Sequence, residues 1–202
     1  MAEYLTMPIL NELIRRVEED PSNADAVKAM TSGILSYYFL INERFIVAPK
    51  STSNEFSTGF EYIIRHIQPS RSENRKIVDH VVARSEVDNI LQSCISRLQQ
   101  SIQHRIPGVE SCWAVLVQGQ SVYFYEYHGQ LPEHERLVPW ALSGRSQEQH
   151  AFHVRRDSVQ IERMLGIWHY MICLRGRQWS MDKYGLTAPK GMIIISGTDI
   201  RA

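Results

Sequence analysis

Residues 59–105 read GFEYIIRHIQ (59–68), PSRSENR (69–75), KIVDHVVAR (76–84) and SEVDNILQSCISRLQQSIQHR (85–105), and they decide the fold that the sequence predicts. The first segment is rich in β-branched and aromatic residues, which favours a strand, and a charged turn follows it. The third segment is almost continuously apolar, which is typical of a central strand covered on both faces. This part of the stretch therefore predicts two consecutive strands.

The fourth segment predicts a long amphipathic helix that ends near Arg105. Ser85 is the expected N-cap, and Asp88 stands roughly where the acidic residue of a capping box would. Pro107-Gly108 ends the helix. The apolar residues of the segment recur at helical spacing: Val87, Ile90, Leu91, Cys94, Ile95, Leu98 and Ile102.

The segments on either side complete an α/β pattern. Gly119-Gln120 joins two short apolar runs and indicates a hairpin, whereas residues 132–149 read as a polar, irregular insertion. The sequence thus predicts one α/β domain over residues 1–202, with a mixed sheet of four or five strands flanked by helices. Further helices are expected at 7–19, 24–40 and 157–174, and further strands at 44–48, 112–118, 121–127, 150–154 and 191–196.

Charge and composition narrow the functional classes. The formal net charge is zero, whereas proteins that bind nucleic acid usually carry a basic face. The N-terminus lacks a basic start followed by an apolar run, so no signal peptide is expected. No apolar run approaches the ~20 residues that span a bilayer. Cys94, Cys112 and Cys173 lack metal-ligand spacing and are expected to be free thiols. We therefore expect an intracellular protein, cytoplasmic or nuclear, with no membrane partner.

The order helix, three strands, helix and strand pair resembles the αβββαβ core of the PD-(D/E)XK nuclease superfamily. More particularly, the chain is similar to divergent fungal proteins of that type, in which a strand ending in Glu-x-Lys precedes a long helix. The most recognisable segment is WAVLVQGQSVYFYEY at 113–127. A Leu…Trp stretch follows at 137–142, and an Asp-led helix follows at 157–165. The resemblance implies a restriction-endonuclease-like fold.

The resemblance covers roughly residues 24–175. Residues 1–23 then form an N-terminal helical segment, and residues 176–202 form a C-terminal extension.

The resemblance also implies a site in which two carboxylates hold Mg²⁺ and a lysine assists the attacking water. Glu61 falls where the first acid belongs, Val82 where the second acid belongs and Arg84 where the lysine belongs. Valine cannot bind a metal ion, and arginine stays protonated and cannot act as a general base. Glu86, expected at the start of the long helix, is the candidate for a migrated acid and a second metal ligand. The implied catalytic set is Glu61, Arg84 and Glu86, in a degenerate form.

Asp79 is a weaker candidate metal ligand. Strand alternation places Val82 and Arg84 on one face and Asp79 on the other. Asp79 therefore replaces Val82 only if a bulge or a register slip intervenes. Each acid also has a structural interpretation: Glu61 as a surface carboxylate, Asp79 as a buried hydrogen-bonding group, and Glu86 as a partner of Arg84.

Arginines near the last helix can contact phosphate, and a neighbouring tryptophan can stack on a base. The alternative is that these arginines interact with the carboxyl end of the helix while the tryptophan packs on the core. The candidate nucleic-acid-binding residues are Arg84, Arg155, Arg156, Arg175, Arg177 and Trp179.

Three hypotheses for function follow. The first is a catalytically inactive nuclease-like protein that binds nucleic acid or another protein. The second is an active Mg²⁺-dependent DNA endonuclease with a rearranged acidic site, and only this hypothesis requires Mg²⁺ as a cofactor. The third is a protein-interaction module with no role in nucleic-acid binding, which the zero net charge fits best. No oligomeric state follows from the sequence.

Overall fold

The structure, a computed structural model, describes residues 1–50, 59–68, 76–87, 90–106, 110–140 and 151–174. For residues 68, 76–80, 105 and 174 it describes the backbone but not the side chain. Within these ranges the helices are α1 (Pro8–Glu19), α2 (Ala24–Tyr38), α3 (Leu91–Arg105) and α4 (Ser158–Leu174), with short 3₁₀ turns η1 (Glu3–Thr6), η2 (Ile41–Glu43) and η3 (Glu133–Glu135). The strands are β1 (Phe45–Lys50), β2 (Phe60–Gln68), β3 (Lys76–Glu86), β4 (Ser111–Gln118), β5 (Ser121–His128), β6 (Leu137–Pro139) and β7 (Phe152–His153).

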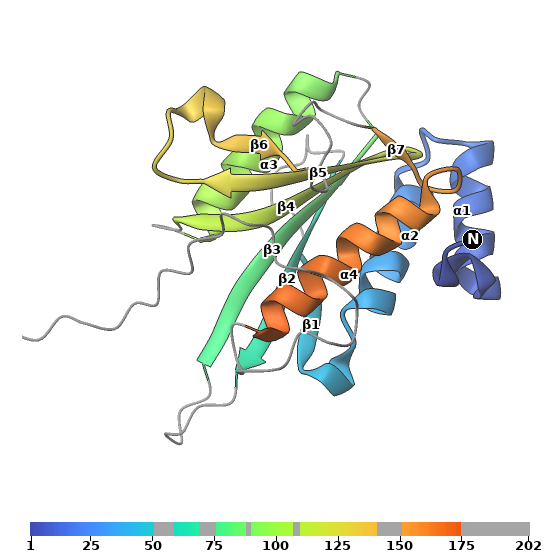
Figure 1. The fold of residues 1–202 in the computed structure, drawn as a ribbon. Helices are drawn as coiled ribbons and strands as arrows, with labels where there is room; N and C mark the ends of the chain where they lie inside the picture. Colours follow the sequence, from blue (N-terminus) through green and yellow to red (C-terminus); the bar gives the residue numbers. More distant parts are fainter. Residues whose placement is uncertain (51–58, 69–75, 88–89, 107–109, 141–150, 175–202) are drawn as a thin grey trace, which may run out of the picture.

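The strands form one mixed, open sheet in the order β1-β2-β3-β4-β5-β6, with β7 also paired to β5. Neighbouring strands are antiparallel except β3 and β4, which are parallel. Helix α3 joins β3 to β4 and is the crossover that two parallel strands require. Figure 1 shows α3 on one face of the sheet, with α2 and α4 on the opposite face.

Two apolar clusters hold these layers together. The larger cluster includes Ala83 and Val115 of the sheet together with side chains of α2 and α4. The smaller cluster includes Val82 and Leu116 of the sheet together with Leu98 of α3. Consecutive residues of β3 thus point into different clusters, as in a strand buried on both faces. The predicted central strand is confirmed.

Local signals in the sequence account for several element boundaries. The side chain of Asn23 accepts a hydrogen bond from the backbone N–H of Ala26 at 3.0 Å and caps α2. Gly119, between β4 and β5, has a φ of 54°, a left-handed conformation that glycine adopts without steric cost. The predicted hairpin is therefore confirmed.

The predicted junction between the second strand and the long helix is wrong. Ser85 and Glu86 belong to β3, and α3 begins only at Leu91. The strand continues because Ser85 and Glu86 pair with Val117 and Gln118 of β4. Pairing in the middle of the sheet overrides the local capping signal, so Ser85 is not an N-cap and Glu86 is not helical.

The pairing of β2 with β3 contains an irregularity. Ile64 pairs with Val81, but the next residue, Arg65, pairs with Asp79, so His80 is left without a register partner. An extra residue of this kind is a β-bulge, which interrupts the alternation of faces along a strand. The bulge lies between Val82 and Asp79, within the stretch for which the sequence predicted regular alternation, and the side chain of Asp79 lies outside the described residues.

The sheet is also wider than predicted. Its seven strands exceed the expected four or five. One reason is that β6 forms inside the segment predicted to be irregular, and both β6 and the short β7 pair with β5. The strand expected at 191–196 lies outside the described residues. In the described part of the chain, no helix has the length and apolar character needed to cross a membrane.

Candidate functional site

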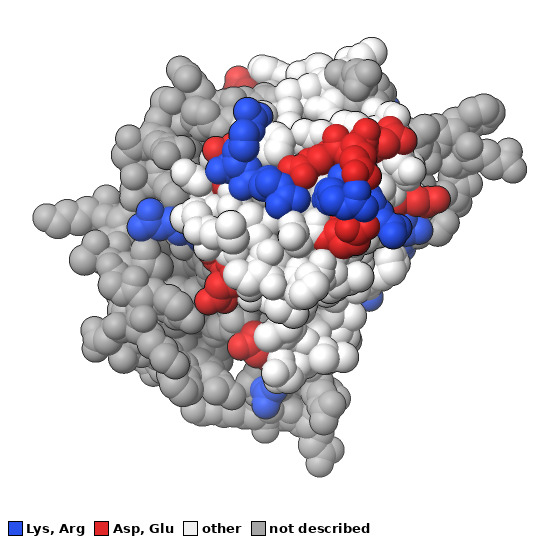
Figure 2. Space-filling view, turned by 90° about the vertical axis from the view of Figure 1, so that its right-hand side faces the viewer, with Lys and Arg blue, Asp and Glu red and all other residues white. Residues whose placement is uncertain are grey.

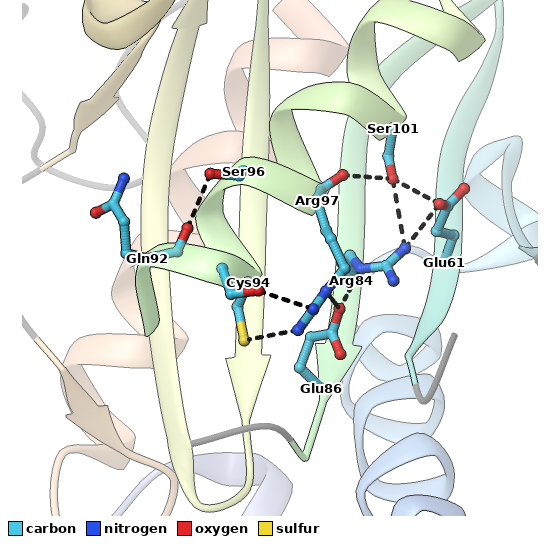
Figure 3. A network of polar contacts seen from close by, with 9 residues as sticks. Glu61, Arg84, Glu86, Gln92, Cys94, Ser96, Arg97 and Ser101 are labelled. Carbon is cyan, nitrogen blue, oxygen red and sulfur yellow. Dashed lines mark hydrogen bonds and ion pairs between the residues drawn. The ribbon is translucent and has the colours of Figure 1, made fainter. Parts of the chain in front are cut away.

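The sheet brings the predicted site residues together on the face that α3 covers. Glu61 of β2 and Arg84 of β3 are direct cross-strand partners. Glu86 lies two residues beyond Arg84 and so points to the same face. Arg97 and Ser101, on consecutive turns of α3, approach these three side chains from the helix (Figure 3). We call Glu61, Arg84, Glu86, Arg97 and Ser101 the ion-pair network.

The guanidinium group of Arg84 bridges the two carboxylates. Its Nη1 lies 2.8 Å from Oε1 of Glu61, and its Nε donates to Oε1 of Glu86. Arg97 donates from Nε to the same oxygen of Glu86 at 2.9 Å. The hydroxyl of Ser101 lies 2.5 Å from Oε1 of Glu61 and 3.4 Å from Nη1 of Arg84. These contacts connect β2, β3 and α3 through charged side chains.

The network is buried. Glu61, Arg84 and Glu86 are 4%, 3% and 1% exposed, whereas the side chain of Arg97 is 31% exposed and reaches toward solvent. Charged groups removed from water to this extent need opposite charges and hydrogen bonds. Two carboxylates face two guanidinium groups, so the charges of the network balance.

Gly59, just before β2, packs against the Glu86 side of the network. A Cβ atom at this position would lie 2.7 Å from the carboxyl carbon of Glu86, which is closer than packed atoms approach. The absence of a side chain at residue 59 therefore lets the backbone lie against the Glu86 carboxylate. This glycine is required by a close approach rather than by its backbone angles.

Val82 occupies the position that the sequence resemblance predicts for the second acid of a nuclease site. It is fully buried in the smaller apolar cluster with Cys94, Leu98 and Ile102 of α3. Its cross-strand partner is Ile63 of β2. The position is therefore part of the packing between α3 and the sheet.

These residues do not fit a divalent cation. A Mg²⁺ site needs several oxygen ligands with net negative charge, but the positive guanidinium of Arg84 already bridges Glu61 and Glu86. A cation placed there would meet an arginine that remains protonated. Among the described residues, no group of three His, Cys, Asp or Glu side chains is placed to hold a metal ion.

The remaining predicted residues are more scattered. The side chain of Asp79 lies outside the described residues, as do Arg175, Arg177 and Trp179. Arg155 donates to Glu18 of α1 at 2.8 Å and to Asn11 at 2.8 Å. Arg156 is exposed beside it, and its backbone N–H contacts His153. Arg155 thus tethers α1 to the segment that precedes α4.

Arg97 and Ser101 were missed at the sequence level. They are four residues apart and flank the apolar stripe of α3 at Cys94, Leu98 and Ile102. Polar residues at that spacing lie along one side of a helix. Two features of the sequence could have pointed to them. Arg97 and Ser101 border the apolar stripe of the helix, and Arg84 lies on the strand that this helix was expected to cover.

Comparison of the chain with models of protein families, with curated proteins and with solved structures gives no match. The resemblance to the PD-(D/E)XK superfamily therefore stays a prediction from the sequence.

Proposed function

We propose that this chain is a nuclease-like α/β domain whose catalytic positions have become a structural ion-pair network, and that it acts by binding a partner. The observation that carries the proposal is the position of Arg84. Its buried guanidinium group bridges Glu61 and Glu86, the two carboxylates that a metal-dependent site would need.

The order of elements supports the nuclease-like part of the proposal. Helix α2 is followed by the antiparallel strands β1, β2 and β3, then by α3, and then by β4 parallel to β3. This is the αβββαβ order of the PD-(D/E)XK core. Glu61 and Arg84 also lie side by side on neighbouring strands, where that core carries its first acid and its lysine.

The chemistry of the network supports binding rather than catalysis. Hydrolysis of a phosphodiester by this route needs carboxylates that hold a metal ion, which then activates water. Here each carboxylate accepts from arginine, and the position of the second acid is the apolar Val82. Arginine can neutralise a phosphate, but it does not take the proton from water.

The net charge and the face that carries α1 support a protein partner over nucleic acid. The chain has a net charge of zero. Figure 2 faces the side of the molecule on which α1 lies, and basic and acidic side chains intermingle there. Arg15 of α1 contacts Glu12 and Glu19, and Arg155 contacts Glu18. Arginines paired in this way offer less positive potential to a phosphate backbone.

Two solution assays test the proposal. With labelled single- and double-stranded DNA and Mn²⁺, we expect no cleavage. Gel shifts at increasing salt are expected to show no salt-sensitive binding. Cleavage that is lost in Glu61→Gln would establish an active site. Binding that weakens steeply with salt would instead establish nucleic acid as the partner.

A gain-of-function variant tests the alignment to the nuclease core. Val82→Glu with Arg84→Lys would supply the second acid and the lysine beside Glu61. If the alignment is right, the double variant binds Mn²⁺ in a calorimetric titration. The single variant Arg84→Lys is the matched control and is expected not to bind. A double variant with a native circular dichroism spectrum and no Mn²⁺ binding would contradict the alignment.

A further inference from the structure

Three tryptophans gather on the face of the sheet that α2 and α4 cover. Trp168 of α4 is fully buried. Trp113 of β4 stacks on it, with ring centroids 5.6 Å apart and planes at 9°. Trp140, just after β6, approaches the same ring with centroids 5.5 Å apart and planes at 48°. Because Trp113 and Trp140 are themselves only half-buried, the cluster has a buried centre and two indole rings that reach the surface.

A carboxylate lies on the same face beside these two indoles. Glu126 of β5 pairs in register with Trp113 on one side and with Val138 of β6 on the other, and side chains paired in this way share a face. Trp140 follows Val138 by two residues, and its backbone N–H donates to the carbonyl of Phe124 at 2.9 Å. Trp140 is thus a diagonal neighbour of Glu126, within reach of a long side chain. We call Trp113, Glu126 and Trp140 the indole site.

The carboxylate of Glu126 is more accessible than those of the ion-pair network. Its side chain is 40% exposed, and among the described residues its ion-pair partner is His128, with Nε2 of the histidine 3.6 Å from Oε2 of Glu126. That distance is longer than a hydrogen bond. Glu61 and Glu86, in contrast, are buried and contact arginines of the network. Glu126 is therefore within reach of a cation that arrives from solvent.

The indole site is separate from the ion-pair network. The network lies on the face that α3 covers, whereas the indole site lies on the opposite face, beside Trp168 of α4. Figure 1 shows that α4 crosses the sheet obliquely and that the start of β4 and the end of β5 extend past it. Trp113 and Glu126 belong to these two strand ends.

The three side chains match the chemistry of a guanidinium group. The face of an indole ring attracts a cation. A guanidinium is planar, so it can stack on the ring and donate two parallel hydrogen bonds to a carboxylate. An ammonium group carries the same charge but lacks the plane and the fork. A phosphate would instead meet the negative charge of Glu126.

We propose that the indole site binds an arginine side chain that the protein partner presents. The guanidinium group stacks on the half-buried indoles and pairs with the carboxylate of Glu126. This inference rests on the proposed function, because it names the chemistry by which the protein partner is recognised. The proposed function does not depend on it in return, since a partner can bind another face of the domain.

A titration of the full chain, followed by nuclear magnetic resonance, tests the site with N-acetyl-arginine amide as the probe. The indole N–H signals of Trp113 and Trp140 should shift progressively as the probe is added. N-acetyl-citrulline amide has nearly the same shape but no charge and should leave these signals in place. N-acetyl-lysine amide should bind more weakly than the arginine compound, because it lacks the planar fork.

Two variants assign the binding to the carboxylate. Glu126→Gln should weaken the binding of N-acetyl-arginine amide by about two- to fivefold, the contribution of an exposed ion pair. Glu43→Gln is the matched control, because the side chain of Glu43 is 45% exposed and also contacts a histidine. It should bind the probe like the wild type. Added salt should weaken the binding to the wild type, because it screens the charges.

Several results would overturn the proposal. One is an equal response of the indole signals to the arginine and citrulline compounds, which needs only the wild type and stays decisive if Glu126→Gln does not fold. Another is a Glu126→Gln variant that binds the probe as tightly as the wild type. A third is a wild type that responds to the probe only after Arg175→Gln and Arg177→Gln, because the chain would then fill the site itself. None of these results changes the outcome of the DNA and Mn²⁺ assays, so failure of the indole site is distinguishable from failure of the proposed function.

Discussion

Removal of Arg84 should be among the most destabilising single changes in this domain. Arg84→Met keeps an unbranched side chain at a position that is 3% exposed, but it leaves the buried carboxylates of Glu61 and Glu86 without the guanidinium that bridges them. Breaking a buried ion pair by removing one partner costs about 3–5 kcal/mol. A domain of ordinary stability has only about 5–15 kcal/mol in total.

The effect can be measured by urea denaturation followed by circular dichroism. With an m-value near 3 kcal/mol per molar, the midpoint should fall by between about 1 and 2 M. The triple variant Glu61→Gln, Arg84→Met, Glu86→Gln removes the stranded charges together with the arginine. It should recover much of the loss, because the three most deeply buried charges are then all replaced by neutral groups, while Arg97, whose side chain is 31% exposed, still reaches solvent.

A matched control separates the effect of breaking a buried ion pair from the effect of removing any arginine. Arg15 also contacts two glutamates, but its side chain is 52% exposed. Arg15→Met should leave the urea midpoint close to that of the wild type, because exposed ion pairs contribute little. The reasoning is refuted if Arg84→Met shifts the midpoint no more than Arg15→Met, or if the triple variant is less stable than Arg84→Met alone.

Three further predictions concern single positions. Gly59→Ala places a methyl group against the Glu86 carboxylate and should lower the free energy of unfolding by about 1–3 kcal/mol, as overpacking does; an unchanged urea midpoint would contradict this. Burial raises the pKa of the Cys112 thiol to about 12. At about pH 8 a thiol reagent should therefore label the partly exposed Cys173 and spare Cys112. Mass spectrometry of the peptides shows which cysteine carries the label, and labelling of Cys112 as fast as Cys173 would contradict the prediction. Asn23→Ala removes the cap of α2 and should cost about 1 kcal/mol, while retention of the wild-type midpoint would show that the cap contributes nothing.

The sequence predicted the layers of the fold because they depend on local patterns. The near-continuous apolar run before Arg84 indicated a strand covered on both faces, and the stripe after it indicated the helix that crosses over. The boundary between them was not predictable in the same way. Ser85 and Glu86 stay in the strand because they pair with β4, a contact between residues about thirty positions apart that no local signal carries.

The sequence predicted Glu61, Arg84 and Glu86 as one candidate site, with the pairing of Arg84 and Glu86 as the alternative interpretation. Strand order and the alternation of faces are enough to place Glu61 near Arg84, whereas Glu86 was expected on the helix and lies in β3. Their connection to the helix depends on Arg97, which approaches from α3 and donates to Glu86 at 2.9 Å. The bulge at His80 was likewise invisible, because a bulge depends on the register between two strands rather than on either strand alone.

The central claim is that the positions of a nuclease site have become a structural network. The most direct test is a calorimetric titration with Mn²⁺ of the wild-type protein and of Glu61→Gln. Because Arg84 bridges the two carboxylates, we expect no saturable binding up to millimolar Mn²⁺, and identical traces for the two proteins. Saturable binding by the wild type that disappears in Glu61→Gln would show that the carboxylates are available to a metal ion, and would contradict the account.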